Sequence, residues 1–238
     1  SFPTRRSSDL SSQFDHELND VSSRLMELGG LVESQIQQAV YALSLFVEDV
    51  ADRVIQCEIQ VNALEVEIDR ELSSIIARRQ PTAIDLRLLM AISKATANLE
   101  RAGDEANKIA RMVKSMIQTG GFKTLPSSEL RLTTEMASGL LRKSLDAFAR
   151  LDTATALTIL KEDDLIDKEF DGFVRKLITY MMEDPRTISS SLDLLFVAKA
   201  LERIGDHAKN IAELVIYIVK GEDVRHASIQ QIETSLQQ

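Results

Sequence analysis

The sequence is poor in residues that punctuate short strands and loops, and poor in residues that form disulfides. Its 238 residues include 4 Pro, 9 Gly, 1 Cys and no Trp. The lone Cys57 excludes an internal disulfide framework and suits a reducing compartment. No apolar run is long enough to span a bilayer, so we expect a soluble, cytoplasmic protein. Few turn-formers amid many Leu, Ala, Ile and Glu favour long helices.

Positive charge and catalytic motifs are scarce as well. The chain has 28 Lys+Arg against 37 Asp+Glu, a formal net charge of -9. This surplus of carboxylates argues against a nucleic-acid partner, whose phosphates it would repel. The sequence has no Gly-rich phosphate loop, no Gly-x-Ser-x-Gly and no Cys/His pairing of the kind that supports nucleophilic catalysis. We therefore do not expect an enzyme.

From residue 12 onward, apolar residues recur at spacings of three and four, which is typical of amphipathic helices. Pro81 and Pro185 should end the second and fifth helices, and Asp152 and Asp184 are candidate caps. Between the third and fourth helices, residues 120–128 carry glycines, a proline and serines that predict a linker. The six predicted helices are 12–48, 50–79, 82–118, 127–151, 153–182 and 187–220.

The two ends of the chain lack this periodicity. The first ten residues, SFPTRRSSDL, match the translation of a common sequencing-adapter oligonucleotide in one frame. We interpret residues 1–11 as an artefactual or disordered N-terminus. The polar residues 221–238 predict a flexible C-terminal tail.

The two halves of the chain repeat one another. NLERAGDEANKIAR at 98–111 returns as ALERIGDHAKNIAE at 200–213. The offset is 102 residues from Asp104 to Asp206 and 104 from Pro81 to Pro185. Solenoid repeats are shorter, about 20–50 residues. The pattern predicts an all-α fold of two tandem three-helix bundles, 12–120 and 127–220.

Each third helix carries a carboxylate pair spaced four residues apart, which places both groups on one helix face. Like charges at this spacing cost a few tenths of a kcal/mol. The pairs are Glu100/Asp104 and Glu202/Asp206, with Glu58/Asn62 and Asp163/Asp167 on the second helix of each unit and Glu65/Asp69 as a further pair in the first. Oxygen donors gathered on rigid helices suit hard cations such as Mg²⁺, Mn²⁺, Ca²⁺ or Fe³⁺. The pairs are therefore candidate metal ligands.

Two other residue types flank these pairs. Gly103 and Gly205 lie inside helices, where Gly costs about 1 kcal/mol relative to Ala. We interpret them as places where another backbone or a ligand comes close. Arg101 and Arg203 fall about a quarter-turn from the carboxylates, and we interpret them as inter-helix ion-pair partners rather than anion ligands.

The acidic pairs can also be interpreted as solvated surface charge without a ligand. Such pairs arise by chance among 37 Asp+Glu, and most charged stripes are solvated. Oxygen-activating di-iron chemistry is disfavoured, since none of the 3 histidines has a Glu three residues before it. Catalytic zinc is disfavoured by the lack of His and Cys.

At these residues the chain resembles the PhoU family of phosphate-transport accessory proteins. The resemblance spans residues 12–226 and is carried by stretches such as ARRQPTAIDLRLLMAISKATANLERAGD, LITYMMEDPRTI and ALERIGDHAKNI. It implies two three-helix bundles whose Glu/Asp-x-x-x-Asp motifs hold multinuclear metal clusters. By position these motifs are Glu100/Asp104, Glu202/Asp206 and Asp163/Asp167. Glu58/Asn62 departs from the pattern by one charge, so the first cluster is expected to be weaker or differently composed.

The resemblance also implies a role. It implies negative regulation of the phosphate-starvation regulon by a homodimeric cytoplasmic adaptor, which reaches the membrane only through its partners. Those partners are the ATPase subunit of a phosphate ABC transporter and a sensor histidine kinase. The expected cofactor is a divalent or trivalent metal ion, Mg, Mn, Fe or Zn, which the sequence does not distinguish. Two alternatives from other classes remain: a metal-storage or redox enzyme, and a structural scaffold with solvated carboxylates.

Overall fold

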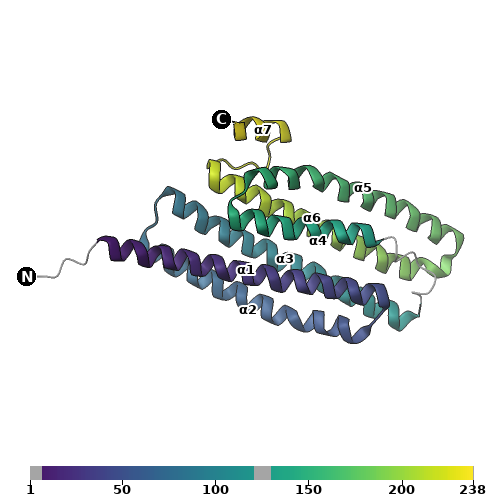
Figure 1. Ribbon diagram of the computed structural model, residues 1–238. Helices are drawn as coiled ribbons and strands as arrows, with labels where there is room; N and C mark the ends of the chain where they lie inside the picture. Colours follow the sequence, from purple (N-terminus) through teal and green to yellow (C-terminus); the bar gives the residue numbers. More distant parts are fainter. Residues whose placement is uncertain (1–6, 121–129, 238) are drawn as a thin grey trace, which may run out of the picture.

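The protein is almost entirely helical. The computed structural model describes residues 7–120 and 130–237 (Figure 1). The first bundle comprises α1 (Ser7–Leu45), α2 (Glu48–Arg79) and α3 (Ala83–Thr119). The second comprises α4 (Leu130–Arg150), α5 (Thr153–Glu183) and α6 (Ile188–Lys220). A 3₁₀ turn, η3 (Pro185–Thr187), precedes α6, and α7 (Ile229–Gln237) follows it. The prediction of an all-α fold with two tandem three-helix bundles is confirmed.

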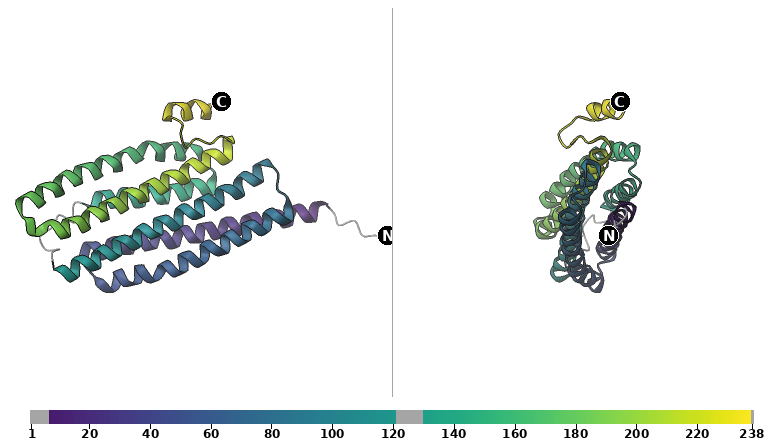
Figure 2. Two further views of the ribbon diagram at one scale, coloured as in Figure 1. Left: turned by 180° about the vertical axis from the view of Figure 1, so that it is seen from behind. Right: turned by 90° about the vertical axis from the view of Figure 1, so that its left-hand side faces the viewer.

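The bundles lie side by side in an elongated molecule, with α3 and α6 in the middle (Figures 1 and 2). These two helices make the most extensive helix–helix contact in the described structure, and α1 also contacts α4. Each central helix packs against the other two helices of its own bundle as well. The two helices that carry the repeated motif therefore form the junction between the bundles.

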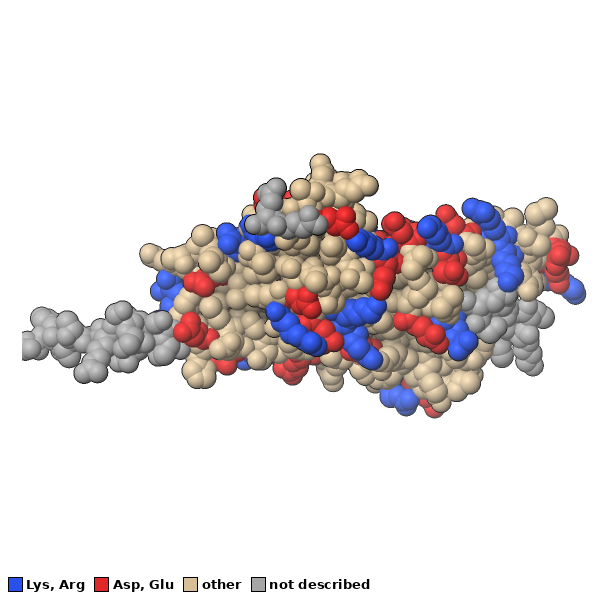
Figure 3. Space-filling view, turned by 45° about the horizontal axis from the view of Figure 1, so that its top comes forward, with Lys and Arg blue, Asp and Glu red and all other residues tan. Residues whose placement is uncertain are grey.

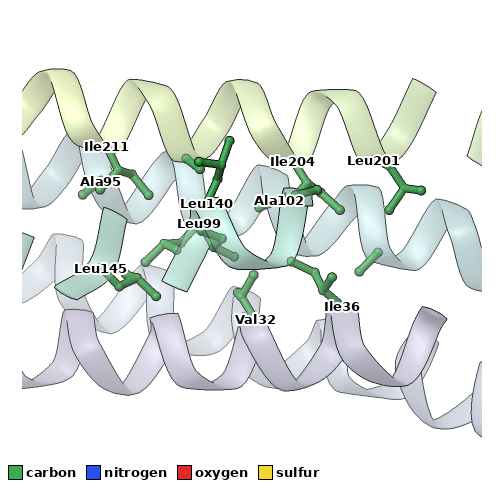
Figure 4. Packing of buried hydrophobic residues seen from close by; sticks show 14 of the residues in the cluster. Val32, Ile36, Ala95, Leu99, Ala102, Leu140, Leu145, Leu201, Ile204 and Ile211 are labelled. Atoms are coloured by element: carbon green, nitrogen blue, oxygen red, sulfur yellow. The ribbon is translucent and has the colours of Figure 1, made fainter. Parts of the chain in front are cut away.

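The core follows from the apolar stripes in the sequence. Residues at three- and four-residue spacings turn inward on every long helix, so that side chains from four helices meet at the junction (Figure 4). Examples with no more than 8% exposure are Val32 and Ile36 of α1, Ala95, Leu99 and Ala102 of α3, Leu140 and Leu145 of α4, and Leu201, Ile204 and Ile211 of α6. Truncating a fully buried leucine such as Leu99 to Ala costs about 2–5 kcal/mol.

Most helix ends fall where the sequence predicts them. The helix α2 stops two residues before Pro81, and its last turn is closed by Gln80 in the left-handed region at φ 47°. Asp152 caps α5, accepting a hydrogen bond from the Thr155 amide at 3.0 Å. Asp184 accepts from the Arg186 amide at 3.0 Å at the start of η3. Pro81 thus marks the α2–α3 turn, the Asp152 cap sets the α4–α5 turn, and Asp184 with Pro185 sets the α5–α6 turn.

Residues 7–11 are predicted to be artefactual or disordered; disorder is wrong for them because α1 begins at Ser7, and their artefactual origin stays a prediction. Between Ser7 and residue 12 the chain has neither Pro nor Gly, so nothing stops the helix from extending toward the N-terminus. The remainder of the prediction, residues 1–6, lies outside the described residues, as does most of the predicted 120–128 linker.

The C-terminal prediction is also wrong, because residues 221–238 contain α7 rather than a flexible tail. A reciprocal cap starts this helix: Gln231 Oε1 accepts from the Ser228 amide at 2.8 Å, and Ser228 Oγ accepts from the Gln231 amide at 3.3 Å. Ile232 is 3% exposed, and Glu233 pairs with Lys161 of α5. Buried Val224 and Ile232, partly buried Ala227 and Leu236, and a capping box dock this mostly polar segment.

Candidate metal centres

The first carboxylate cluster lies between α2 and α3. The loop at residues 80–82 makes these helices antiparallel neighbours, so the outward faces of both contribute side chains to one place. Partial burial raises the pKa of Glu100 above its usual range, and the nearby Asp104, Glu65 and Glu58 raise it further. The pKa of Glu65 is raised by partial burial, then by Asp69 and Asp104. Carboxylates whose charge Arg101 offsets only in part therefore face one another here.

Two of the predicted first-bundle residues, Glu58 and Asn62, have other surroundings. Glu58 is tied to α3, since its Oε2 accepts a hydrogen bond from Asn107 Nδ2 and lies 3.9 Å from Arg111 Nη2. Asn62 is one turn further along α2 and its side chain is exposed. Glu65, which the family motif leaves out, adds to the charge around Glu100, whereas Asp69 acts on Glu65 and accepts a hydrogen bond from Ser93 Oγ at 3.5 Å.

The second cluster lies between α5 and α6 and brings all four predicted residues together. Burial raises the pKa of Asp206 to about 6, and Glu202, Asp163 and Asp167 add to the shift. The pKa of Asp167 is raised by partial burial and then by Asp163 and Glu202. Lys209 reaches across from α6, with Nζ 2.8 Å from Asp163 Oδ2. The cluster is thus partly neutralised by the protein's own ammonium group.

The repeated glycines have a different cause from the one expected. A Cβ on Gly205 would lie 2.8 Å from Ile166 Cδ1, and one on Gly103 would lie 2.9 Å from Gln35 Oε1. Both contacts come from side chains of neighbouring helices rather than from a backbone. The glycines make room for helix packing immediately before each aspartate.

The donor chemistry of both clusters fits a hard cation, because every donor is an oxygen and the carboxylates lack enough counter-charge. The side-chain positions do not form a finished coordination shell: in residues 7–120 and 130–237 no three His, Cys, Asp or Glu side chains converge closely enough to hold a metal. Like-charged carboxylates spread apart, and partly exposed side chains are free to turn. The clusters offer ligands that a cation would have to draw together.

The arginines beside the motif face the junction of the bundles. A groove of about 690 Å³ runs between α3 and α6 and has Asp104 and Asp206 in its walls. Arg203 Nη1 lies 3.3 Å from Glu105 Oε1 across this junction, so its interpretation as an inter-helix ion-pair partner is confirmed. Arg101 lines the groove and offsets the charge of Glu65 and Glu100. Figure 3 shows acidic and basic side chains intermixed near the middle of one face.

Two similar bundles, joined through the helices that carry the motif, define a duplicated helical-bundle protein with one carboxylate cluster per half. A family model described as the PhoU domain matches twice, at residues 25–113 and 130–215. Each match falls on one bundle. The chain belongs to the PhoU family.

Individual relatives support the same family assignment. A Burkholderia sp "phosphate-specific transport system accessory protein PhoU homolog" is 50% identical over 94% of this chain and 95% of its own length. The Escherichia coli K12 "phosphate-specific transport system accessory protein PhoU" is 45% identical over 95% and 93%. A crystal structure of PhoU from Pseudomonas aeruginosa superposes with a TM-score of 0.85, at 45% identity, covering 88% of this chain and 100% of that one. Among the described helices, none has the length and apolar character needed to cross a bilayer.

Proposed function

We propose that this chain is an accessory protein of phosphate-specific transport. The observation that carries the proposal is full-length similarity to proteins of that name: identities of 45–50% extend over at least 94% of this chain. The ranges matched by the family model, residues 25–113 and 130–215, include most of both bundles and the positions of the repeated motif. Relatives of this similarity and coverage support a shared role better than a shared fold alone would.

We further propose a regulatory role without catalysis, as a cytoplasmic adaptor that represses the phosphate-starvation regulon. Its partners would be the ATPase subunit of the phosphate ABC transporter and a sensor histidine kinase, and a homodimer would be the working form. Long helices packed through a continuous buried core give the broad, rigid surfaces that such contacts require. Intermixed surface charge suits reversible protein contacts more than nucleic-acid binding.

The third part of the proposal concerns metal. Glu58, Asn62, Glu100 and Asp104 of the first bundle would hold one cation, with Glu65 and Asp69 as a further acidic pair beside them. The second-bundle ligands would be Asp163, Asp167, Glu202 and Asp206. A bound Mg, Mn, Fe or Zn ion would neutralise the repelling carboxylates and hold the paired helices together.

The regulatory role is tested by deleting the gene in its host and following an alkaline phosphatase or other phosphate-scavenging reporter in phosphate-rich medium. The proposal predicts strong derepression, reversed by a plasmid copy of the wild-type chain. Leu99→Asp, which places a charge in the core, serves as a matched loss-of-fold control and should not restore repression. Normal repression in the deletion strain would contradict the regulatory role.

A further inference from the structure

Each bundle has an open groove between its first and second helices, whereas the carboxylate clusters lie between the second and third. The groove between α1 and α2 has a volume of about 560 Å³, and the groove between α4 and α5 has one of about 360 Å³. The α1 wall of the first groove consists of Glu27, Gly30, Leu31 and Ser34. The positions 109 residues later are Met136, Gly139, Leu140 and Lys143, all of which line the second groove. The groove is therefore part of the repeated unit.

The grooves coincide with glycines that the packing of the described residues does not explain. Three of the six glycines inside the described helices, Gly29, Gly103 and Gly205, would have a side chain of a neighbouring helix 2.8–2.9 Å from an added Cβ. The other three, Gly30, Gly139 and Gly172, would meet nothing within 4 Å. Gly30 and Gly139 line the grooves, and the position 105 residues before Gly172 is Glu67, in the α2 wall of the first groove. Glycine is unfavourable inside a helix, and a close approach from outside the chain accounts for it here.

Apolar side chains line both grooves. In the first groove these are Leu31 and Leu64, which are partly buried, and Ala63, which is exposed. In the second they are Met136, Leu140 and Leu165, and Leu165 is 49% exposed. Apolar surface gathered in a groove and still open to solvent gains free energy when a partner covers it.

The charge of the lining is negative in the first groove and more balanced in the second. Glu27 and Glu67 are exposed in the lining of the first groove, which includes no Lys or Arg. Arg24, which is outside that lining, has Nη1 3.1 Å from Glu67 Oε2. In the second groove Lys143 is part of the lining, with Nζ 2.7 Å from Glu162 Oε2. The first groove therefore favours a partner that carries basic side chains beside an apolar surface.

An α-helix is the partner element that fits these features. Two packed helices present a furrow that accepts the side-chain ridge of a third helix, and a glycine lets the backbone of that helix come close. Recognition of an amphipathic helix by an apolar groove is a recurring mode of protein binding. Strand addition is not available in residues 7–120 and 130–237, because these contain no strand. Anionic lipid headgroups and nucleic acid would be repelled by Glu27 and Glu67.

We propose that the two grooves are docking sites for amphipathic helices of partner proteins. The apolar face of the docked helix lies against Gly30 or Gly139, and in the first groove its basic side chains pair with Glu27 and Glu67. This inference rests on the adaptor part of the proposed function and adds the surface through which partners bind. Because the grooves belong to different bundles, one chain offers a site to each of two partners.

The test measures by calorimetry how the full chain binds two purified probes from its host, the cytoplasmic part of the sensor kinase and the ATPase subunit of the phosphate transporter. Gly30→Leu and Gly139→Leu fill one groove each, and the control Ser73→Leu adds bulk at an exposed position of α2 that lines neither groove. We expect a groove variant to lose about tenfold or more in affinity for one of the probes, and Ser73→Leu to change affinity by less than about twofold.

The outcomes separate the groove from the adaptor role. Binding that both Gly30→Leu and Gly139→Leu leave unchanged would overturn the proposed docking sites while the adaptor role stands. If the wild-type chain binds neither probe, the adaptor role fails and the docking proposal fails with it. Sedimentation velocity identifies a second copy of this chain as the occupant: self-association lost in Gly30→Leu, with both probes still bound, would overturn the proposal.

Gly30→Ala distinguishes docking from a purely structural role and adds much less bulk than leucine. Its methyl group meets no neighbour, so the midpoint of thermal unfolding should rise by about 1–4 °C. Affinity for the probe that binds the first groove should nevertheless fall about threefold or more. A higher midpoint with unchanged affinity would overturn docking at Gly30.

The basic character of the docked helix is tested by reversing the charge of the groove. Glu27→Lys should weaken binding of the same probe about threefold or more, with a larger effect at low ionic strength. Asp15→Lys makes the same change at an exposed position of α1 that lines neither groove, and it should leave the affinity within about twofold of wild type. Equal effects of the two reversals, or tighter binding by Glu27→Lys, would overturn the basic character of the helix.

Discussion

Arg203 of α6 reaches across the junction between the bundles to Glu105 of α3, with Nη1 3.3 Å from Oε1. The same oxygen lies 2.6 Å from Lys108 Nζ. The Glu105 side chain is only 6% exposed, whereas both cations are about half exposed. A single buried carboxylate therefore holds one cation from each bundle.

Removing this carboxylate should loosen the junction. We expect Glu105→Ala to lower the free energy of unfolding by about 1–3 kcal/mol, less than for a fully buried pair because its partners are half solvated. Glu135→Ala, which removes an exposed partner of Arg131 on α4, should stay within about 0.5 kcal/mol of wild type. Urea unfolding of both variants provides the measurement, and equal effects would contradict the assignment of Glu105.

Replacement of two adjacent glycines in α1 by alanine should change the stability of the protein in opposite directions. A Cβ on Gly29 would lie 2.8 Å from both Cδ atoms of Leu145 in α4, but one on Gly30 would meet nothing within 4 Å. We expect Gly29→Ala to destabilise the protein by about 1–3 kcal/mol through overpacking. Gly30→Ala should stabilise it by about 0.5–1 kcal/mol through better helix propensity. Thermal unfolding of the two variants measures these changes in stability. A change of the same sign in both variants would show that α1 and α4 are not packed this closely.

The pH dependence of the metal-free protein should reveal the second cluster. The pKa of Asp206 is raised from 3.8 to about 6, so the folded chain holds this proton more tightly than the unfolded chain does. The contribution of Asp206 to stability is therefore present below about pH 4 and is lost as the pH rises toward 6 and beyond. Asp206→Asn removes that loss. Between pH 4 and 7 the free energy of unfolding of this variant should rise by about 1–2 kcal/mol relative to that of wild type.

Urea unfolding of the chelator-treated proteins at several pH values measures this difference. Asp146→Asn, a change at an exposed position on α4, is the control and should follow wild type across the range. A gap between Asp206→Asn and wild type that stays constant with pH would mean that burial and the neighbouring carboxylates do not raise the pKa of Asp206.

Much of this structure could be predicted from the sequence because local signals set it. Pro81, Asp152 and Pro185 act on their own segments, and the offset between Asp104 and Asp206 alone indicates two copies of one unit. The docking of α7 could not be predicted because its capping box lies in a polar stretch and its few apolar anchors, Ile232 and Leu236, show no long helical period.

The composition of the two clusters could be predicted only in part. Spacing of i and i+4 shows which carboxylates share a face of one helix, but not which side chains of the next helix lie opposite. That depends on the register of α2 against α3 and of α5 against α6, which brings Glu65 toward Glu100 and Lys209 onto Asp163. The roles of Gly103 and Gly205 likewise depend on Gln35 and Ile166, which are far from them in the chain.

The central claim is that the repeated carboxylates are kept because each bundle binds a cation. The most direct measurement is the metal content per chain of the purified protein, set against an Asp104→Ala/Asp206→Ala variant with the same helical content and unfolding midpoint under chelating conditions. The account predicts bound metal in the wild-type chain and its loss in the variant. Little metal in either protein, after purification without chelators and incubation with Mn²⁺ or Fe²⁺, would contradict the claim and leave the carboxylates as surface charge.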